Sequence, residues 1–270
     1  MFKDIFQKPF NCIGMVHLPP LPGAPHRKPD QLENILKIAN RDALSLQEAG
    51  FEGILVENYG DAPYYASKVP LETITTMTLV AWEMRKVISI PIGINVLRND
   101  PIAALAIAHA AMANFIRINI HMGVVDTDQG RIEGNAADTL RYRTHLGAEN
   151  IAIFTDARVK HAQPVAPFKD IFDEIEALLY RGDSDAIIIT GPATGKPVDP
   201  PLVKIIREKN PQVPLLVGSG VTEEQLPHLV KYVDGVIVGT SIKVDGKTTN
   251  PVDPIRATRF INVVRSLVGE

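Results

Sequence analysis

Eight short apolar runs, rich in valine and isoleucine, recur along the chain at intervals of about 20 to 40 residues. Runs of this composition and length are typical of strands that are buried on both faces of a parallel sheet. Stretches with the 3.6-residue period of an amphipathic helix separate them. The runs lie at residues 12–18, 53–58, 91–96, 115–120, 151–157, 186–190, 214–220 and 235–241.

Residues that commonly begin or end helices agree with this alternation. Glycine, or asparagine followed by proline, lies where four of the predicted helices should end. Three Asp-Pro pairs suit a capping residue followed by the first helical turn. The helix-ending residues are Gly50, Gly147, Gly182 and Asn210 with Pro211, and the capping pairs begin at Asp100, Asp199 and Asp253.

Alternating strands and helices require right-handed crossovers and a parallel sheet. Eight such units in about 250 residues predict an α/β fold, a closed (β/α)8 or TIM barrel. We expect one domain over residues 1–270, with residues 1–10 closing the bottom of the barrel. An open doubly wound sheet would need a glycine-rich fingerprint after the first strand. Residues 17–25 read HLPPLPGAP instead, and proline cannot build that phosphate loop.

The composition excludes several classes of protein. Of the residues, 45% are hydrophobic and 22% charged, and the 28 basic residues are scattered, so no nucleic-acid footprint or polybasic membrane patch is predicted. The longest apolar stretch, residues 101–116, is too short to span a bilayer, and the first residues lack the apolar segment of a secretory signal. We therefore expect a cytoplasmic protein with no transmembrane segment. The single cysteine, Cys12, is interpreted as a reduced core residue.

Two turns rich in glycine and hydroxyl groups follow the seventh and eighth predicted strands. Glycines let backbone N–H groups approach an anion, and a short helix starting at Thr240 would point its N-terminus at a phosphate. Tight turns that need glycine for steric reasons are the alternative. In this fold the loops after strands seven and eight often hold phosphate, which favours the first interpretation. The predicted phosphate-binding residues are Thr190, Gly191, Gly218, Ser219, Gly220, Gly239, Thr240 and Ser241.

Polar residues gather at the ends of the other strands, where a barrel of this kind carries its active site. Arg117, Asn119 and His121 alternate along the fourth run and should share one face, as should Asp156, Arg158 and Lys160 after the fifth. Burying so many polar groups without partners would cost several kcal/mol each, so they must pair with one another or with a ligand. The candidate catalytic residues are His17, Glu57, Asn95, Arg117, Asn119, Asp156 and Lys160.

Each candidate also has a structural interpretation. His17 could be a core histidine whose hydrogen bonds are satisfied, and Glu57 or Asp156 could simply pair with Arg117. The asparagines could bond neighbouring backbone. Lys160 could be a solvated loop cation, a phosphate clamp or a Schiff-base amine.

Common catalytic motifs are missing from the sequence. It has no HExxH, paired CxxC or GxSxG pattern, so zinc-protease and serine-hydrolase functions are not predicted. No cofactor is predicted, although Glu57 and Asp156 could hold Mg²⁺ together with substrate oxygens.

The stretch 121–135, HMGVVDTDQGRIEGN, is long for a loop between a strand and a helix of a barrel. Three glycines punctuate it, at positions 123, 130 and 134. We expect it to cover the mouth of the barrel and to become more ordered when a ligand binds.

Several strings resemble the signature of the BtpA family, which includes the SgcQ proteins. The most specific is MVHLPPLPG at residues 15–23, and the resemblance extends over essentially the whole chain. The other matching strings are ENYGDAP at 57–63, GINVL at 93–97, DARVKHA at 156–162, VGSGVT at 217–222, VGTS at 238–241 and NPVD at 250–253.

The resemblance implies a barrel of the ribulose-phosphate-binding type, which agrees with the predicted phosphate site. It supplies no reaction, because none is settled for the family. Two functions therefore stand: a lyase or isomerase acting on a sugar phosphate or related metabolite, and an assembly factor for photosystem I. The second would apply to a phototroph, with photosystem I proteins as partners and a place at the periphery of the thylakoid membrane. Formation of a homo-oligomer is left open.

Overall fold

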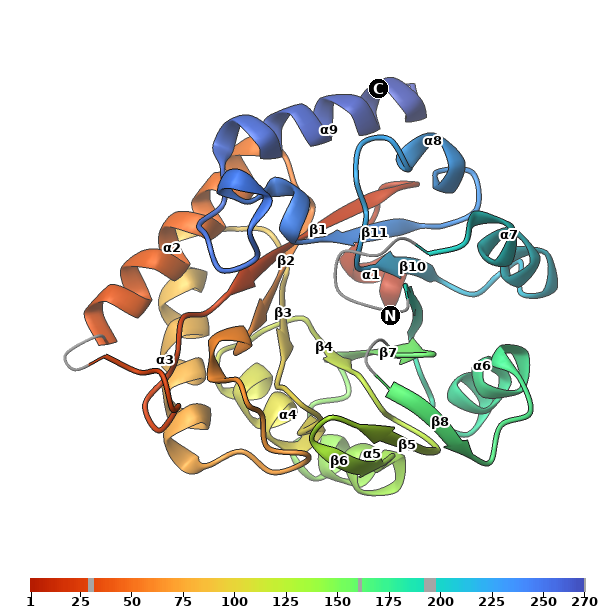
Figure 1. The fold of residues 1–270 in the computed structure, drawn as a ribbon, viewed down its shortest axis with the longest axis horizontal. Coiled ribbons are helices and arrows are strands. Elements are labelled where there is room, and N and C mark those ends of the chain that lie inside the picture. The colour runs from red at the N-terminus through yellow and green to blue at the C-terminus, as the bar shows by residue number, and fades with distance from the viewer. Residues whose placement is uncertain (29–31, 160–161, 192–197, 270) are drawn as a thin grey trace.

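The computed structural model describes residues 1–28, 32–159, 162–191 and 198–269 of the chain. Its eight parallel strands close into a barrel in the order β1-β11-β10-β9-β7-β4-β3-β2 (Figure 1), which confirms the predicted TIM barrel. Each of the eight apolar runs contains one of these strands. They are β1 (Asn11–His17), β2 (Gly53–Glu57), β3 (Ile92–Asn95), β4 (Phe115–Ile118), β7 (Ala152–Ala157), β9 (Ala186–Thr190), β10 (Leu215–Gly218) and β11 (Gly235–Val238).

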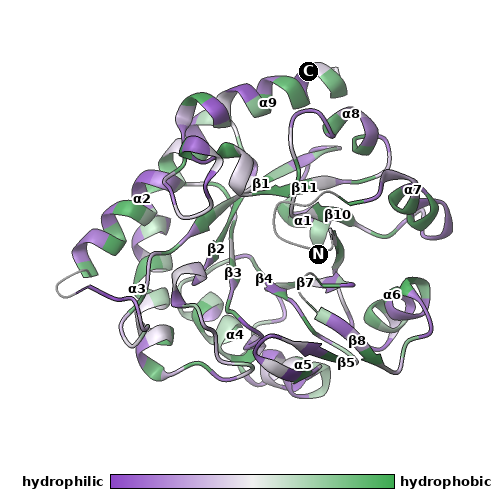
Figure 2. Cartoon of the chain, viewed as in Figure 1, coloured by the Kyte–Doolittle hydropathy of each residue, from purple (hydrophilic) through white to green (hydrophobic). Residues whose placement is uncertain are grey.

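Helices surround the barrel and connect its strands. Hydrophobic and hydrophilic residues alternate along the outer helices (Figure 2), as expected for helices that bury one face against the strands. The carboxylates of Asp100 and Asp253 accept backbone N–H bonds at two helix starts, as predicted, whereas Asp199 makes no such side-chain bond. The helices are α2 (Leu32–Ala49), α3 (Leu71–Val87), α4 (Pro101–Ala110), α5 (Ala136–His145), α6 (Ile171–Tyr180), α7 (Pro200–Lys209), α8 (Leu226–Leu229) and α9 (Pro254–Val268).

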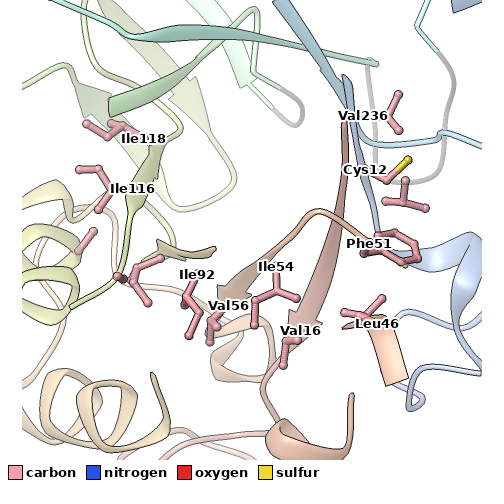
Figure 3. Close-up of a cluster of buried hydrophobic side chains, with 14 of the residues drawn as sticks. Cys12, Val16, Leu46, Phe51, Ile54, Val56, Ile92, Ile116, Ile118 and Val236 are labelled. Atoms are coloured by element: carbon pink, nitrogen blue, oxygen red, sulfur yellow. The ribbon is translucent and has the colours of Figure 1, made fainter. Parts of the chain in front are cut away.

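Alternate side chains of each barrel strand point outward and form the main core against the helices. Val16, Ile54 and Ile116 belong to this outer layer, with Leu46 of α2 packed beside it (Figure 3). Cys12 lies in the same layer and is fully buried, in agreement with its interpretation as a core residue. Burial, and secondarily the nearby carboxylate of Glu52, raises the pKa of the Cys12 thiol.

The inward-facing side chains at the lower, N-terminal end of the strands are aromatic and aliphatic. Phe115 of β4 and Phe154 of β7 stack with their ring centroids 4.6 Å apart. The short helix α1 (Phe2–Ile5) adds Phe2, and the residue after it adds Phe6, whose ring lies 5.7 Å from that of Phe115. These four rings form an aromatic plug at the bottom of the barrel.

A small second sheet stands beside the barrel, in the order β6-β5-β8. The stretch 121–135, expected to be a long loop, folds into an antiparallel hairpin of β5 (Val124–Thr127) and β6 (Gly130–Glu133). The third strand, β8 (Ala162–Ala166), comes from the segment after β7. Three strands are enough to give such a sheet some stability of its own, which a plain loop would lack.

Candidate functional site

The strand register brings four candidate residues to one level of the barrel. His17 of β1 pairs with Glu57 of β2, Glu57 with Asn95 of β3, and Asn95 with Arg117 of β4. All four side chains alternate with outward-facing core residues, so they share the interior face of the barrel. Three of them, Glu57, Asn95 and Arg117, are buried, and His17 is half-buried.

An ion pair between two neighbouring strands occupies the centre of this level. Arg117 donates two hydrogen bonds to the carboxylate of Asp156, both 2.9 Å long. Burial opposes the charge on Arg117, but attraction by Asp156 and the hydrogen bond to it outweigh burial, so the pKa of Arg117 is raised. The guanidinium of Arg117 therefore stays charged in the interior.

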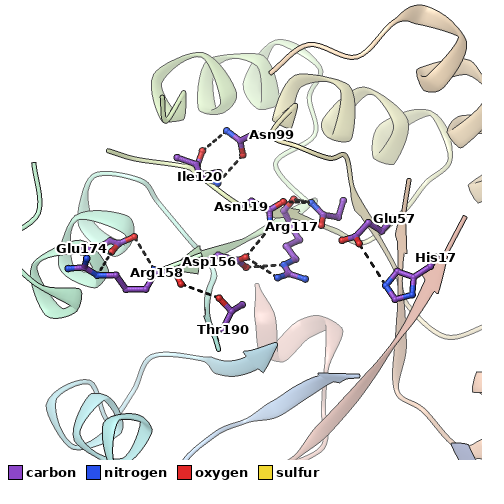
Figure 4. A network of polar contacts seen from close by, with 11 residues as sticks. His17, Glu57, Asn99, Arg117, Asn119, Ile120, Asp156, Arg158, Glu174 and Thr190 are labelled. Atoms are coloured by element: carbon purple, nitrogen blue, oxygen red, sulfur yellow. Dashed lines mark hydrogen bonds and ion pairs between the residues drawn. The ribbon is translucent and has the colours of Figure 1, made fainter. Parts of the chain in front are cut away.

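Asn119 and Asn95 complete this network. Figure 4 shows Asn119 beside Arg117 and Asp156. Asn119 donates to Asp156 at 3.0 Å, and Asn95 donates both to the carbonyl of Arg117 and to the side-chain oxygen of Asn119, each at 3.1 Å. Asn95 thus bonds backbone, as its structural interpretation expected, and it bonds a side chain as well.

A second pair lies across the mouth from the first. His17 Nε2 is 3.8 Å from Glu57 Oε1 (Figure 4), and the ring of Tyr59 lies 4.8 Å from the His17 ring. A histidine in contact with a carboxylate can accept or release a proton near neutral pH. This pair is therefore suited to general acid–base chemistry.

The glycine-rich turns and members of both pairs line the same small cavity. Ser219, Gly220, Gly239 and Thr240 line it together with His17, Glu57 and Arg117. Both Ser219 and Gly220 have positive φ, 79° and 68°, so this turn has the left-handed backbone in which glycine is preferred.

Gly239 approaches the histidine closely. A Cβ there would lie 3.0 Å from Cε1 of His17, so a larger residue would crowd the cavity. The predicted short helix is present as the 3₁₀ turn η2 (Thr240–Ile242), and the Thr240 hydroxyl bonds that of Thr248 at 2.9 Å.

Four predicted phosphate-binding residues do not line this cavity. The hydroxyl of Thr190 donates to the carbonyl of Arg158, and that of Ser241 donates to the carbonyl of Val221. Gly218 packs beneath the cavity, where a Cβ would lie 2.9 Å from Ile188. Gly191 is buried at the end of β9. Among the catalytic candidates, Lys160 lies outside the described residues.

Two further residues were expected beside the candidates and point elsewhere. His121 should have shared a face with Arg117, but β4 ends at Ile118, and His121 Nε2 instead contacts the carbonyl of Gly182 at 2.8 Å. Arg158 should have shared a face with Asp156, but its φ of 55° turns it toward α6, where it pairs with Glu174 at 3.2 Å. The alternation fails at both positions because it holds only while the strand continues.

The sequence reasoning missed Arg98 and Tyr59, both near the site. Arg98 is buried; burial lowers its pKa, while the nearby charges of Asp156 and Glu57 oppose that shift. It directly follows the GINVL string at residues 93–97, so an arginine at the end of the third strand was a signal available in the sequence. Tyr59 lies inside the ENYGDAP string and is part of the cavity wall.

The proposed Mg²⁺ ligands each have a basic side chain as a neighbour, Glu57 beside His17 and Asp156 beside Arg117. Within the described ranges no group of three or more His, Cys, Asp or Glu side chains could hold a metal ion. Mg²⁺ binding here stays a prediction that would require substrate oxygens.

Known proteins are similar to this chain over most of its length. The model of the BtpA family matches residues 7–266. An uncharacterised protein of Thermococcus kodakarensis is 45% identical, with 98% of each chain covered. The photosystem I biogenesis protein BtpA of Synechocystis sp. is 39% identical, covering 96% of this chain and 89% of the relative.

Solved structures share the fold at low identity. Thiamine phosphate pyrophosphorylase from Pyrococcus furiosus superposes with a TM-score of 0.59 at 11% identity, covering 96% of this chain and 98% of that one. N-(5′-phosphoribosyl)anthranilate isomerase from the same organism has a TM-score of 0.56 at 11% identity, covering 95% and 99%. Across the part of the chain that is described, no helix is both long and apolar enough to cross a membrane.

Proposed function

Because the chain belongs to the BtpA family, we propose that it binds a phosphorylated small molecule in the barrel mouth and acts on it as a lyase or isomerase. One observation carries this proposal. A single cavity is lined both by two glycine-rich turns, which carry neutral donors, and by the His17–Glu57 pair.

The phosphate would bind at the turns after β10 and β11. Backbone N–H groups around Ser219, Gly220 and Gly239 and the hydroxyl of Thr240 are donors suited to phosphate oxygens. Arg117 also lines the cavity, and its positive charge favours an anion even though Asp156 balances it. The glycine-rich turns themselves contain no arginine, and Arg117 reaches the cavity from β4 instead.

The proton transfer would take place beside the phosphate, because Gly239 lies next to His17. Isomerisation or cleavage of a sugar phosphate moves a proton to or from carbon or oxygen beside a carbonyl, and His17 and Glu57 are the groups suited to carry it. Arg117, held in position by Asp156, would bind substrate oxygens by hydrogen bonds. The likeness to barrels named for phosphorylated substrates, thiamine phosphate pyrophosphorylase and phosphoribosylanthranilate isomerase, supports this assignment.

The second candidate is an assembly factor for photosystem I. The 39% identity to the Synechocystis protein of that name favours it. A pure scaffold, however, has no need of buried charges such as Arg117, Asp156 and Glu57 at the mouth of the barrel, and these are costly to bury. A binding experiment can distinguish the two functions, because only the first requires the cavity to bind a phosphate ester.

Thermal unfolding in the presence of inorganic phosphate, sulfate and ribose 5-phosphate tests the proposal. A ligand at one hundred times its Kd would stabilise the fold by about 2.7 kcal/mol, a melting shift of roughly 5 to 10 °C for a domain of this size. We expect Gly220→Asp to remove the shift by placing a carboxylate in the cavity.

Gly147→Asp is the matched control, because Gly147 also has positive φ, 61°, but lies after α5 with no atoms within 4 Å of an added Cβ. It should keep the ligand shift of the wild type. If the wild type binds none of these anions at millimolar concentration, the proposed phosphate site is wrong.

A further inference from the structure

A larger chamber adjoins the phosphate cavity on the side of β1 and β2. Its volume is about 740 Å³, and it shares His17 and Tyr59 with the cavity. These two side chains therefore stand between the cavity and the chamber, and a ligand that fills both must pass them. Ligand sites of roughly 300 to 1,000 Å³ hold molecules of drug size, so a simple pentose phosphate would leave most of this space unfilled.

The walls of the chamber differ in chemistry from those of the cavity. Pro19, Pro20, Ile38, Tyr64 and Pro251 give it a largely apolar, ring-rich lining. Tyrosine and proline rings offer flat faces, against which a planar group packs with favourable dispersion and stacking. His26, Arg41 and Asp42 also line the chamber, so a ligand there meets flat apolar faces beside a few polar groups.

The loops that form this wall are fixed by backbone contacts. Leu18 N–H donates to the carbonyl of Glu57 at 2.9 Å, and Gly60 N–H donates to the carbonyl of Leu18 at 3.0 Å. A Cβ on Gly60 would come within 2.4 Å of the Pro20 nitrogen, so the two loops touch. Tyr64 is held by a hydrogen bond from its hydroxyl to the carbonyl of Tyr59, 2.8 Å long. A wall fixed in this way needs little reorganisation to bind a ligand.

The far rim of the chamber is polar. Asp128 and Gln129, in the turn between β5 and β6, line one side, and Thr249 and Asn250 line another. The extra hairpin thus supplies a wall of the chamber at the mouth. A planar group with hydrogen-bonding atoms on its outer edge would satisfy both the apolar walls and this rim.

We infer that the ligand is a phosphate ester that also carries a flat aromatic or heterocyclic ring, with the phosphate at Ser219–Gly220 and Gly239–Thr240 and the ring in the chamber between Pro20, Tyr59 and Tyr64. This inference rests on the proposed phosphate site and adds the second half of the molecule. It distinguishes a ring-bearing phosphate ester from a plain sugar phosphate.

Calorimetric titration with ribose 5-phosphate, adenosine 5′-monophosphate and phenyl phosphate tests the inference on the full chain. The two ring-bearing esters place a ring at different distances from the phosphate. We expect at least one of them to bind about 10-fold or more tightly than ribose 5-phosphate, because a ring buries roughly 100 Å² of apolar surface in the chamber.

Two variants change the chamber and leave the phosphate turns untouched. Thr249→Trp should fill it from an exposed turn, and Ile38→Ser should make its α2 wall polar. Both should reduce the advantage of the ring-bearing ester several-fold without changing the affinity for ribose 5-phosphate. Ile205→Ser, on the exposed face of α7, is the matched control and should change neither affinity.

The outcomes separate the inference from the function on which it rests. If ribose 5-phosphate binds and neither ring-bearing ester binds more tightly, the inference is overturned and the phosphate site stands. If a ring-bearing ester binds equally to the wild type and to Gly220→Asp, the chamber holds a ring but the phosphate assignment fails. If none of the three binds, both are wrong.

Discussion

The two ends of the barrel interior are built from the same strands with opposite chemistry. On β4, Phe115 lies at the lower level and Arg117 two residues higher; on β7, Phe154 and Asp156 have the same relation. The lower pair stacks ring on ring, and the upper pair forms a bidentate ion pair. Because strand side chains alternate, two residues along one strand are enough to pass from a layer that stabilises the fold to a layer suited to bind a ligand.

The aromatic layer should carry more of the stability than the charged layer. Phe154→Ala removes a buried ring that contacts Phe2, Phe6 and Phe115, and should lower the free energy of unfolding by about 4 kcal/mol. Denaturant unfolding measures the loss. Phe154→Leu, which keeps most of the volume, should lose clearly less, and an equal loss would contradict the packing explanation.

Removing one partner of the Arg117–Asp156 pair should lower the free energy of unfolding, but the pair as a whole should not be needed for folding. Asp156→Ala leaves the buried Arg117 without its partner and should cost about 3 kcal/mol. Replacing the pair together, Arg117→Met with Asp156→Leu, should recover most of that stability, since buried pairs often exchange for apolar residues at little cost.

The same double variant should lose the ligand-induced shift in melting temperature that the wild type shows. Stability and ligand binding should therefore be measured on the wild type, on Asp156→Ala and on the double variant. Together they test whether the upper layer serves ligand binding and not folding. A double variant that stays as unstable as Asp156→Ala would mean that the upper layer is needed for folding.

The dependence of stability on pH should come in part from His121, which lies outside both layers. Burial is the main cause that lowers its pKa below the ordinary value. In an unfolded chain the imidazole has a pKa of about 6.5. Below that pH the unfolded state therefore binds a proton that the folded state does not yet bind. The contribution of His121 to stability is therefore present above about pH 6.5 and is lost as the pH falls toward the folded pKa.

His121→Gln keeps a donor for the Gly182 carbonyl and removes the titration. Between pH 7 and pH 5.5, urea unfolding should show a smaller loss of stability in this variant than in the wild type. His109→Gln, at an exposed position on α4, is the control and should follow the wild type. Identical pH profiles for the wild type and His121→Gln would contradict this assignment.

The smallest expected effect is in the hairpin of β5 and β6. Its turn lines the chamber at the mouth, so a bound ligand should slow amide exchange at Asp128 and Gln129 by several-fold. Exchange at amides of β4 and β7 should be unchanged, because those strands are already part of the barrel. If amide exchange in the hairpin turn is the same with and without ligand, the prediction that residues 121–135 become more ordered on ligand binding is wrong.

The parts that the sequence predicted well have a local physical cause. The eight strands follow from apolar runs that are buried on both faces, and α4 and α9 begin at the aspartates whose carboxylates cap them. The inward direction of Arg117 and Asp156 follows from alternation within a strand. Each of these properties depends on neighbours a few residues away in the chain.

The parts that were missed depend on contacts between distant segments. The partner strand of the hairpin, residues 162–166, lies about 35 residues further along the chain, so the small sheet had no local signature. The buried pair of Lys243 with Asp42 joins the loop after β11 to α2, and nothing near either residue indicates it. His121 and Arg158 were misplaced because a strand period was continued beyond the end of its strand.

The aromatic plug also determines from which end of the barrel a ligand can enter. Among the described residues, Phe2, Phe6, Phe115 and Phe154 pack across the bottom of the barrel, so a ligand would reach the cavity from the loops at the top. A ligand would enter and leave through the same opening, so a second molecule could bind only after the first had dissociated. For an enzyme on this scaffold, a product would compete directly with its own substrate for entry, and accumulation of product would slow turnover by occupancy alone.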